Sequence, residues 1–451
     1  MKKILACLCC VSLLFGTAVC NITASAGEAP KERSKEVTYK GITYYIDLGK
    51  NVSVTAVDDK LYASYNPEYA QTKVFAFPSE IQYEETGETL PVTYISGGFR
   101  DLSATKIIIP KTVKNFNAGF VNGFAGNESL EEVTIEEGSV LENIGSFYSC
   151  TNLKRIGIGE TNKLPDTVTS IGGSAFEDCS SLESIVLSDN LEKIKYNAFK
   201  NCIKLQEIDI PATISSIEPE AFYGCTNLAK VNFNTYTQGE NKGKSNLNDL
   251  STSVFKNCTN LTEINLPLST HTYKISDNRF ENTGIKSINI PESVDEIKPN
   301  AFVGVNFENT LETDKGEKYA IGIFNSQCQF SFWLGHHLFG DQYNDIPKDE
   351  RPTIAGYAYS TSNDFAITED FNFISVGEWN PFKVIYPGDV DGDGKTSSKD
   401  SMLIQRSSIG LVKLTDDQVT AADVNKDGKV SSKDALLILR FSIGYKVEGL
   451  S

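Results

Sequence analysis

Histidine, methionine and tryptophan are scarce in this chain of 451 residues, which has three, two and two of them respectively. Three histidines leave little material for a histidine-rich metal site or for histidine-based catalysis. Basic residues are also in the minority, 42 against 59 acidic residues, so the formal net charge is −17. Because an acidic surface repels phosphate backbones, we expect no nucleic-acid partner.

Long apolar runs are absent except at the N-terminus. Two lysines precede the apolar run from Ile4 to Val19, and Ala24-Ser25-Ala26 follows it. This order predicts a secretory signal peptide of residues 1–26 and an extracellular, secreted protein without a membrane span. Two alternatives stay open: a membrane anchor, for which the run is short, and a lipid anchor at Cys20, where the preceding residues are atypical.

A repeat of about 23 residues fills the middle of the chain. The triad Leu182-Ile185-Leu187 recurs 23 residues later as Leu205-Ile208-Ile210, and again as Leu228-Val231-Phe233. The last four residues of each unit alternate, which predicts a short strand with one face inward. One such coil cannot bury its apolar stripe alone, so stacked coils must share a continuous core. A phenylalanine accompanies the units at Phe99, Phe124, Phe147, Phe176, Phe199, Phe222, Phe255, Phe280 and Phe302.

These units resemble the bacterial-surface type of leucine-rich repeat, whose pattern reads IGxxAFxxCxxLxxIxIP. Ile171-Gly172, Ala175-Phe176, Cys179 and Leu182 fall on that pattern. The resemblance implies an α+β chain whose leucine-rich repeat solenoid consists mostly of short β-strands and precedes a small α-helical module. The expected parts are an N-terminal cap at 27–94, repeats at 95–307, an unassigned insertion at 308–352, a C-terminal cap at 353–386 and the module at 387–451.

Five cysteines each follow a repeat phenylalanine by three residues. Parallel side chains of adjacent coils have poor geometry for disulfides, and a free cysteine packs as a small hydrophobe. We therefore expect a ladder of buried thiols, with disulfides or metal ligation as the alternative. The residues are Cys150, Cys179, Cys202, Cys225 and Cys258, whereas Cys328 lies outside the ladder.

Outward strand positions are expected to form two lanes on a concave face. They are polar and of mixed charge, without the aromatic ladder usual for sugar-binding surfaces, so this face suits a protein ligand or is a solvated scaffold. An adjacent histidine pair in the insertion, His336 and His337, points to opposite faces if it lies on a strand, which argues against a shared site. The lanes are Glu132, Arg155, Ser184, Glu207, Lys230, Glu263 and Ser287, and Thr134, Gly157, Val186, Asp209, Asn232, Asn265 and Asn289.

Two twelve-residue loops near the C-terminus have the spacing of calcium ligands. Carboxylate or carboxamide oxygens stand at positions 1, 3, 5 and 12, a carbonyl at 7 and a serine at 9, which suits a hard cation. Gly394 and Gly428 permit the sharp turn at position 6. The loops predict two calcium ions, held by Asp389, Asp391, Asp393, Lys395, Ser397 and Asp400, and by Asp423, Asn425, Asp427, Lys429, Ser431 and Asp434.

A helix is expected after each loop, at 399–409 and 433–443, but none of ordinary length precedes the first, where Tyr386-Pro387-Gly388 stands. This EF-hand-like arrangement resembles the type I dockerin over residues 387–448. The resemblance implies binding to a cohesin domain of a cellulosome scaffold. The partner-contact positions of that family fall on Ser398, Lys399, Gln405, Arg406, Ser432, Lys433, Leu439 and Arg440.

These features predict a secreted, non-catalytic leucine-rich repeat protein that attaches to a scaffold through its dockerin, while its repeats bind a protein or a cell surface. The alternative is a dockerin-borne enzyme of polysaccharide degradation, because paired catalytic carboxylates leave no fixed motif. No Ser/His/Asp, Cys/His or zinc motif is visible in the sequence. A calcium sensor is a third hypothesis, which secretion disfavours because extracellular calcium is nearly constant.

Overall fold

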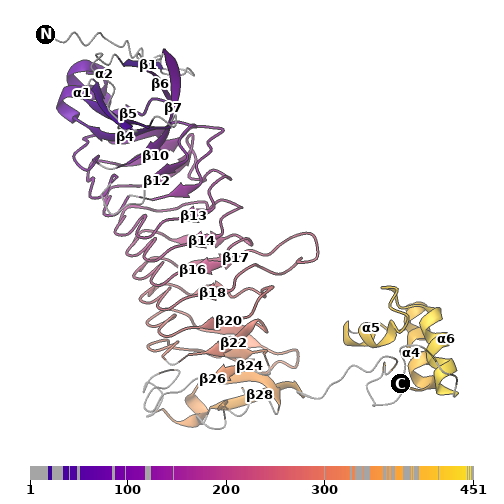
Figure 1. Ribbon diagram of the computed structural model, residues 1–451. Helices are drawn as coiled ribbons and strands as arrows, with labels where there is room; N and C mark the ends of the chain where they lie inside the picture. Colours follow the sequence, from indigo (N-terminus) through magenta and orange to yellow (C-terminus); the bar gives the residue numbers. More distant parts are fainter. Residues whose placement is uncertain are drawn as a thin grey trace. The chain divides into compact units, whose positions relative to one another are not determined.

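A computed structural model of the chain divides into two compact units, Met1–Trp379 and Asn380–Ser451, shown in Figure 1. Among the described residues, no helix has the length and apolar character that crossing a membrane requires. The structure describes residues 19–22, 34–39, 41–47, 51–83, 87–96, 98–116, 123–145, 147–298, 300–325, 328–330, 339, 346–358, 362, 365–366, 371–378, 388, 390, 396–414, 416–443, 445 and 447.

The first unit begins with an antiparallel meander of β2 (Ser34–Tyr39), β3 (Ile42–Asp47) and β4 (Asn51–Val57). Strand β4 pairs in parallel with β7 (Glu88–Ile95), which starts the stacked coils. Most of the predicted signal peptide lies outside the described residues. The remaining elements are α1 (Asp59–Tyr65), α2 (Pro67–Thr72), β5 (Val74–Ala76), β6 (Glu80–Tyr83) and β1 (Val19–Ile22), which pairs with β6.

Most of the predicted Leu-x-x-Ile-x-Ile strands are present and pair in parallel, with mainly isoleucine or valine pointing inward. We call this set the first ladder. Each strand has three or four residues and offers one or two inward side chains, and the neighbouring coils supply the rest of the core. The strands are β8 (Lys106–Ile109), β10 (Glu132–Ile135), β12 (Arg155–Ile158), β15 (Glu207–Ile210), β17 (Lys230–Phe233), β19 (Glu263–Asn265) and β21 (Ile288–Ile290).

A second parallel ladder runs down the same coils, and several of its strands follow one another in Figure 1. Most of its members contribute only two residues, one outward and one buried aliphatic. The repeat is therefore a coil with two short strands, where the sequence predicted one. The strands are β9 (Asn115–Phe116), β11 (Asn143–Ile144), β13 (Ser170–Ile171), β14 (Lys193–Ile194), β16 (Ser216–Ile217), β18 (Asp249–Leu250), β20 (Tyr273–Ile275) and β22 (Val294–Ile297).

The predicted phenylalanines form one continuous stack in the core. From Phe99 to Phe302, consecutive rings lie 5.0 to 5.9 Å apart between centroids, and all but the first pair are within 17° of parallel. Phe77 meets the first ring edge-on, and Phe307 meets the last ring in the same way. Edge-to-face contacts are favourable for aromatic rings, so the stack is closed at both ends by rings of another orientation.

The cysteine ladder is a set of free, buried thiols. Each thiol donates a hydrogen bond to the carbonyl of the repeat phenylalanine in the preceding coil, as Cys202 does to Phe176 at 3.1 Å. Asn127 reaches the Phe99 carbonyl in the same way, at 2.9 Å. Desolvation raises the pKa of the Cys150 thiol to about 12, so the reactive thiolate is scarce at neutral pH.

We therefore expect the thiols from Cys150 to Cys328 to resist iodoacetamide at pH 8 in the native protein and to react after unfolding in guanidinium chloride. The physical reason is burial of all six thiols, together with the raised pKa of the thiols of Cys150, Cys179, Cys202 and Cys258. Mass spectrometry of peptides measures the labelled fraction. Ile203→Cys, at an exposed neighbour of Cys202, is the positive control and should be labelled at once. Rapid labelling of Cys202 itself would contradict a buried ladder.

The first ladder is interrupted at residues 182–187, where the sequence predicted a strand. The only pairing there is an isolated bridge between Val186 and Lys163, with the Val186 N–H donating to the Asn162 carbonyl at 2.9 Å. The segment that follows β12 lies beside this coil and also covers Gly157, where a Cβ atom would come within 2.6 Å of the Thr161 carbonyl oxygen. The expectation of two continuous outward lanes is therefore wrong at Gly157.

The strand pairing of the second ladder is broken between β18 and β20. A buried arginine links the two coils at this break. Arg279 occupies the repeat position of Ala198 and Ala221, yet it is fully buried. Its Nε donates to the Ser251 carbonyl at 3.0 Å and its Nη1 to the Lys274 carbonyl. Desolvation lowers the pKa of the guanidinium to about 9, so it remains charged at neutral pH. The side chain thus replaces backbone hydrogen bonds that the longer coil omits.

Residues 308–352, for which the sequence predicted an unassigned insertion, contribute to both ladders. Strand β25 (Ile321–Ile323) pairs with β21, and β26 (Gln329–Phe330) pairs with β22. Trp333, His336 and His337 lie outside the described residues. The other elements are the β23 (Leu311–Glu312) and β24 (Lys318–Tyr319) hairpin, η1 (Lys348–Glu350), β27 (Thr353–Ala358) and β28 (Asn372–Glu378), of which β27 and β28 extend the sheet of β25.

The second unit is helical, with α4 (Ser398–Ser408), α5 (Asp416–Ala422) and α6 (Ser432–Ser442). Helices α4 and α6 start within one residue of the predicted helices. They share a small apolar core of their own, formed by Val390, Ile404, Leu414, Ala421, Ala422, Val424, Ala435, Ile438 and Val447.

Candidate functional site: two calcium loops and the helices that leave them

Helices α4 and α6 each begin with a capping box whose acidic member ends a predicted calcium loop. The Ser397 hydroxyl accepts from the Lys399 N–H at 3.1 Å, and the Asp400 carboxylate accepts from the Ser397 N–H at 2.7 Å. Ser431 and Asp434 repeat the box in α6, at 3.0 Å between the Ser431 N–H and the Asp434 carboxylate. This box orients the position-12 carboxylates of both loops.

The same carboxylates connect the end of each loop to its beginning. The Val390 N–H donates to Asp400 Oδ1 at 2.7 Å, and the Asn425 N–H donates to Asp434 Oδ1 at 3.4 Å. Both aspartates have no exposed surface. Among the described residues no lysine, arginine or histidine forms an ion pair with Asp434. Because a buried charge is costly unless a countercharge meets it, this position suits a bound cation.

The second loop is described along its whole length and turns its polar oxygens inward. Asp423 Oδ1 and Asn425 Oδ1 accept from the same donor, the Asp427 N–H, at 3.1 and 2.9 Å. Two ligand oxygens that share one nitrogen lie next to each other. Asp423 Oδ2 also accepts from the Gly428 N–H at 2.9 Å, and Gly428 has a φ of +79°, which only glycine adopts readily. The backbone thus forms the turn that the sequence predicted at position 6.

The donor set of the second loop fits calcium. It consists of oxygens alone, from carboxylates, one carboxamide, a hydroxyl and a carbonyl, which is the chemistry that this hard cation takes. In the part of the chain that the structure describes, no three His, Cys, Asp or Glu side chains form a metal cluster by themselves. Three of the predicted ligands of the second loop, Asp423, Asp427 and Asp434, are of these types, so the structure does not bring their carboxylates together around one point. In the first loop, Asp389, Asp391, Asp393 and Lys395 lie outside the described residues.

The eight predicted partner positions all lie on exposed surface of α4 and α6. The two helices contact each other directly, and the Ser401 hydroxyl donates to the Ala435 carbonyl at 2.8 Å. Equivalent residues therefore occupy equivalent places on the two helices. The positions are Ser398, Lys399, Gln405 and Arg406 on α4, and Ser432, Lys433, Leu439 and Arg440 on α6.

The sequence reasoning missed a set of exposed apolar residues on the same helices. Met402 and Ile409 belong to the first helix and its end, and Leu436 and Ile443 are their equivalents 34 residues later. Leu411 and Tyr445 extend the two sets just beyond the helices. The sequence did contain a signal for these residues. In each helix, two apolar residues seven positions apart lie on the face that does not pack into the core. Matched apolar residues on a small charged module indicate an interaction surface.

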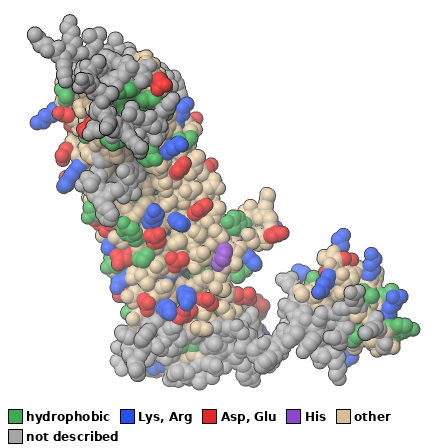
Figure 2. All heavy atoms as spheres, viewed as in Figure 1, with side chains coloured by type: hydrophobic (Ala, Val, Ile, Leu, Met, Phe, Trp, Pro, Cys, Tyr) green, Lys and Arg blue, Asp and Glu red, His purple; other side chains and the backbone are tan. Residues whose placement is uncertain are grey.

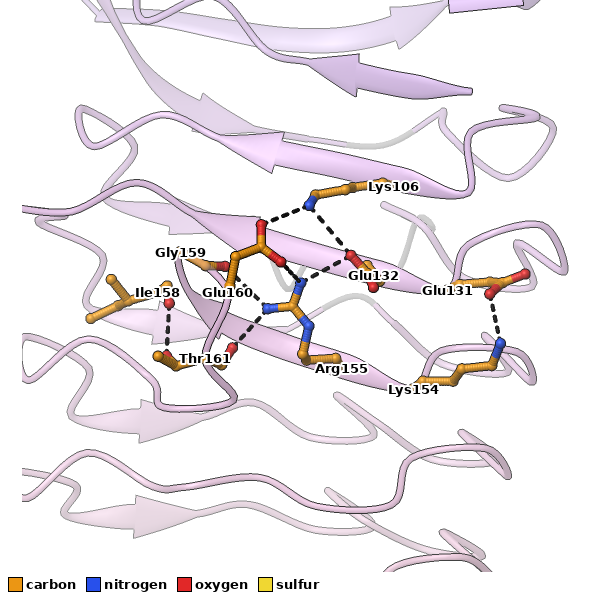
Figure 3. Close-up of polar contacts among 9 residues, drawn as sticks. All are labelled: Lys106, Glu131, Glu132, Lys154, Arg155, Ile158, Gly159, Glu160 and Thr161. Carbon is orange, nitrogen blue, oxygen red and sulfur yellow. Dashed lines mark hydrogen bonds and ion pairs between the residues drawn. The ribbon is translucent and has the colours of Figure 1, made fainter. Parts of the chain in front are cut away.

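Outward positions of the first ladder carry a closed cluster of ion pairs, shown in Figure 3. Lys106 lies 3.4 Å from Glu132 and 3.0 Å from Glu160, and Arg155 lies 2.9 and 3.1 Å from the same two carboxylates. Desolvation opposes ionisation of Glu132, but the hydrogen bond and charge of Arg155 and the charge of Lys106 outweigh it and lower its pKa. A carboxylate kept ionised this way is a poor general acid, so Glu132 serves here as the partner of the two cations.

Charge is well mixed elsewhere on the repeats. Figure 2 shows acidic and basic side chains interspersed along the coils on the side in view. Many of them pair with the next coil, as Lys256 does with Glu281 at 2.7 Å and Lys200 with Glu220 at 2.6 Å. Such exposed pairs contribute little stability.

The chain belongs to the BspA type leucine rich repeat family, whose profile matches six copies over residues 79–163, 158–243 and 240–309. A Dockerin type I domain matches residues 387–441. Both domain types agree with the resemblances found in the sequence. Type I dockerins bind calcium and cohesin domains, so a calcium-dependent assembly function follows for this part of the chain.

Solved structures of bacterial leucine-rich repeat proteins are similar to this chain. A protein from Bacteroides ovatus is 23% identical over 71% of this chain and 70% of its own, with a TM-score of 0.47. The T. pallidum leucine-rich repeat protein is 23% identical over 55% and 89%, with a TM-score of 0.35. The pneumococcal vaccine antigen PcpA is 16% identical over 76% and 98%, with a TM-score of 0.35. No curated protein matches.

Proposed function

We propose that this protein is a secreted, non-catalytic component that its dockerin attaches to a cohesin of a cellulosome scaffold, while its repeats bind a protein or a surface. The observation that carries the proposal is the pair of equivalent exposed faces on α4 and α6, each held by a capped loop with calcium-type donors. The cluster of paired carboxylates in Figure 3 is neutralised by Lys106 and Arg155, which favours a binding role over a hydrolytic one.

Two calcium ions would be held by the twelve residues predicted from the loops. Asp423, Asn425, Asp427 and Asp434 would provide side-chain oxygens in the second loop, with the carbonyl of Lys429 and the hydroxyl of Ser431. The calcium ion supplies the positive charge that a buried aspartate requires. The residues of the chain supply part of the orientation, since the capping box fixes Asp434 and the Asn425 N–H donates to Asp434 Oδ1.

Cohesin binding is expected to use either of the two helix faces. Ser398, Lys399 and Arg406 on α4 have the same identity as Ser432, Lys433 and Arg440 on α6, whereas Gln405 and Leu439 differ. A partner that recognises one face would therefore find a similar one on the other helix. The difference at Gln405 and Leu439 gives the two orientations unequal affinities.

Paired substitutions test this use of two faces. Ser398→Ala with Lys399→Ala, and Ser432→Ala with Lys433→Ala, should each lower cohesin affinity only a few-fold, because the other face substitutes. All four changes together should lower it by roughly a thousandfold, since both faces then lose a hydrogen-bonding hydroxyl and a charge. Isothermal titration of the calcium-loaded chain with a type I cohesin measures the affinity.

Lys413→Ala, an exposed change outside α4 and α6, is the matched control and should bind as the wild type does. If one pair alone abolishes binding, only a single face is used. Reproducible hydrolysis of a polysaccharide or protein by the purified chain would instead favour the enzyme hypothesis.

A further inference from the structure

A row of uncharged side chains crosses the N-terminal strands of the second ladder and its meander. Tyr45 on β3 pairs in register with Ser53 on β4, and Ser53 pairs with Tyr94 on β7. The register continues through β9 and β11 to β13, so that each residue of the row is the direct neighbour of the next. We call this row the tyrosine–amide lane; it consists of Tyr45, Ser53, Tyr94, Asn115, Asn143 and Ser170.

Both tyrosines of the lane present their rings to solvent. Tyr45 is 43% exposed and Tyr94 37%, whereas their chain neighbours Tyr44 and Ile95 point inward and are buried. Side chains stand roughly perpendicular to a sheet, and one strand carrying the small Ser53 separates the two tyrosines. Two strand spacings place the rings about 10 Å apart, with a low point between them.

The other half of the lane offers hydrogen-bonding groups. Asn143 donates from Nδ2 to Asn115 Oδ1 at 2.6 Å, which orients both amides, and each amide has further donor or acceptor sites. Ser170 is 8% exposed, yet its hydroxyl has no hydrogen-bond partner in the described structure. Because this oxygen is covered by the protein, the hydrogen-bonding groups that the lane offers to a ligand are the two amides.

We infer that the tyrosine–amide lane binds a neutral, extended, β-linked glycan that runs across the strands. Sugar rings expose C–H faces that stack on aromatic rings, and their hydroxyls pair with amide and hydroxyl groups without needing a charge. The six residues of the lane offer both chemistries and carry no charge, and the next residues in register beyond its two ends are Glu36 on β2 and Lys193 on β14. The outward lanes of the first ladder lack aromatic side chains, and six of their fourteen positions are charged, so they fit a neutral glycan less well.

An extended peptide fits this surface poorly. A peptide that adds to a sheet hydrogen-bonds to an exposed strand edge, whereas the lane crosses the middle of consecutive paired strands. The inference extends the proposed binding role of the repeats by naming a class of ligand. Only the link between that ligand and a scaffold rests on the proposed dockerin function. A glycan held by the repeats would place the scaffold beside its polysaccharide.

The test is isothermal titration of the full calcium-loaded chain with cellohexaose and xylohexaose. Maltohexaose, which is α-linked and curved, and hexagalacturonate, which is charged, serve as comparison ligands. Cellohexaose or xylohexaose should bind at least tenfold more tightly than either comparison ligand. Tyr45→Ala and Tyr94→Ala should each lower that affinity about tenfold, the typical effect of one stacked ring, and the double variant should show no measurable binding.

Two exposed tyrosines outside the lane provide matched controls. Tyr148→Ala and Tyr196→Ala remove rings that are 43% and 49% exposed, and both variants should bind as the wild type does. Tyr94→Phe keeps the ring and should retain most of the affinity. Binding of none of the neutral hexaoses, equal binding of maltohexaose, or undiminished binding by the double variant would overturn the inference. Cohesin binding, measured on the same preparations, separates failure of the lane from failure of the dockerin proposal.

Discussion

Removal of calcium with a chelator should unfold the dockerin, residues 387–448, and leave the repeat unit folded. The helices of this segment share a core of few apolar residues, and its buried Asp434 carboxylate needs a cation. Calcium at a thousandfold excess over its dissociation constant stabilises a site by about 4 kcal/mol, which is much of the stability of so small a domain. Calorimetry should therefore lose one transition and keep the other, with the helical circular dichroism falling as the strand signal stays.

Substitution of a single calcium ligand tests the calcium dependence of the dockerin without a chelator. Asp423→Ala and Asp389→Ala each remove a charged oxygen from position 1 of a loop and should lower the calcium affinity of that loop at least tenfold. Asp314→Ala, an exposed aspartate of the β23–β24 hairpin, is the matched control and should leave calcium binding unchanged. A dockerin transition that stays at the same temperature with chelator would refute calcium-coupled folding.

Phe199→Ala should cost the repeat unit roughly 3–5 kcal/mol, because truncation of a fully buried phenylalanine leaves a cavity. The ring stacks between Phe176 and Phe222 at 5.3 and 5.1 Å, so the cavity also interrupts the column. Each coil contacts mainly its neighbours, and damage should begin locally before the array melts. Native-state hydrogen exchange should show faster exchange first in the coils around residue 199, together with a lower thermal midpoint.

Ile203→Ala is the control for that variant, since it lies in the same coil but is substantially exposed. It should change the unfolding free energy by no more than about 0.5 kcal/mol. An unchanged thermal midpoint in Phe199→Ala would show that the ring does not contribute to the packing of the core. That result would contradict the proposed register of the repeats.

The repeat could be predicted from the sequence because its core residues recur at a fixed spacing and alternate within each strand. Phe176, Phe199 and Phe222 keep their register through three coils, and stacked rings require it. The second ladder escaped prediction because each coil contributes about two residues to it, as at Ser170–Ile171, which is too short to show an alternation.

Residues 321–323 escaped prediction for a different reason. They lie 33 residues after Ile288–Ile290, with which they pair, because the β23–β24 hairpin is inserted after Phe302, where the next repeat strand was due. The interruption at Val186 depends on where the segment after β12 folds, and the role of Arg279 depends on a missing backbone pairing. Both follow from tertiary contacts between coils and have no local signal in the sequence.

The calcium loops could be located from the sequence because ligand spacing within twelve residues is a local property. The capping boxes of Ser397 and Ser431 lay within the same pattern, although the reasoning from ligands alone did not use them. The exposed apolar residues Met402 and Leu436 were missed because an amphipathic helix is normally interpreted by its buried face. The tyrosine–amide lane joins residues 45 to 170, and only the strand register places them side by side.

The coils differ in length far more than in height. Successive phenylalanines are 22 residues apart at Phe280–Phe302 and 33 apart at Phe222–Phe255, yet their rings are separated by 5.4 and 5.6 Å. Extra residues therefore leave the column as surface loops and do not alter its pitch. In evolutionary terms, a descendant of this chain can acquire or lose a loop in one coil and keep the ring stack, while the neighbouring coil adjusts its strand pairing, as at residues 182–187 and at Arg279.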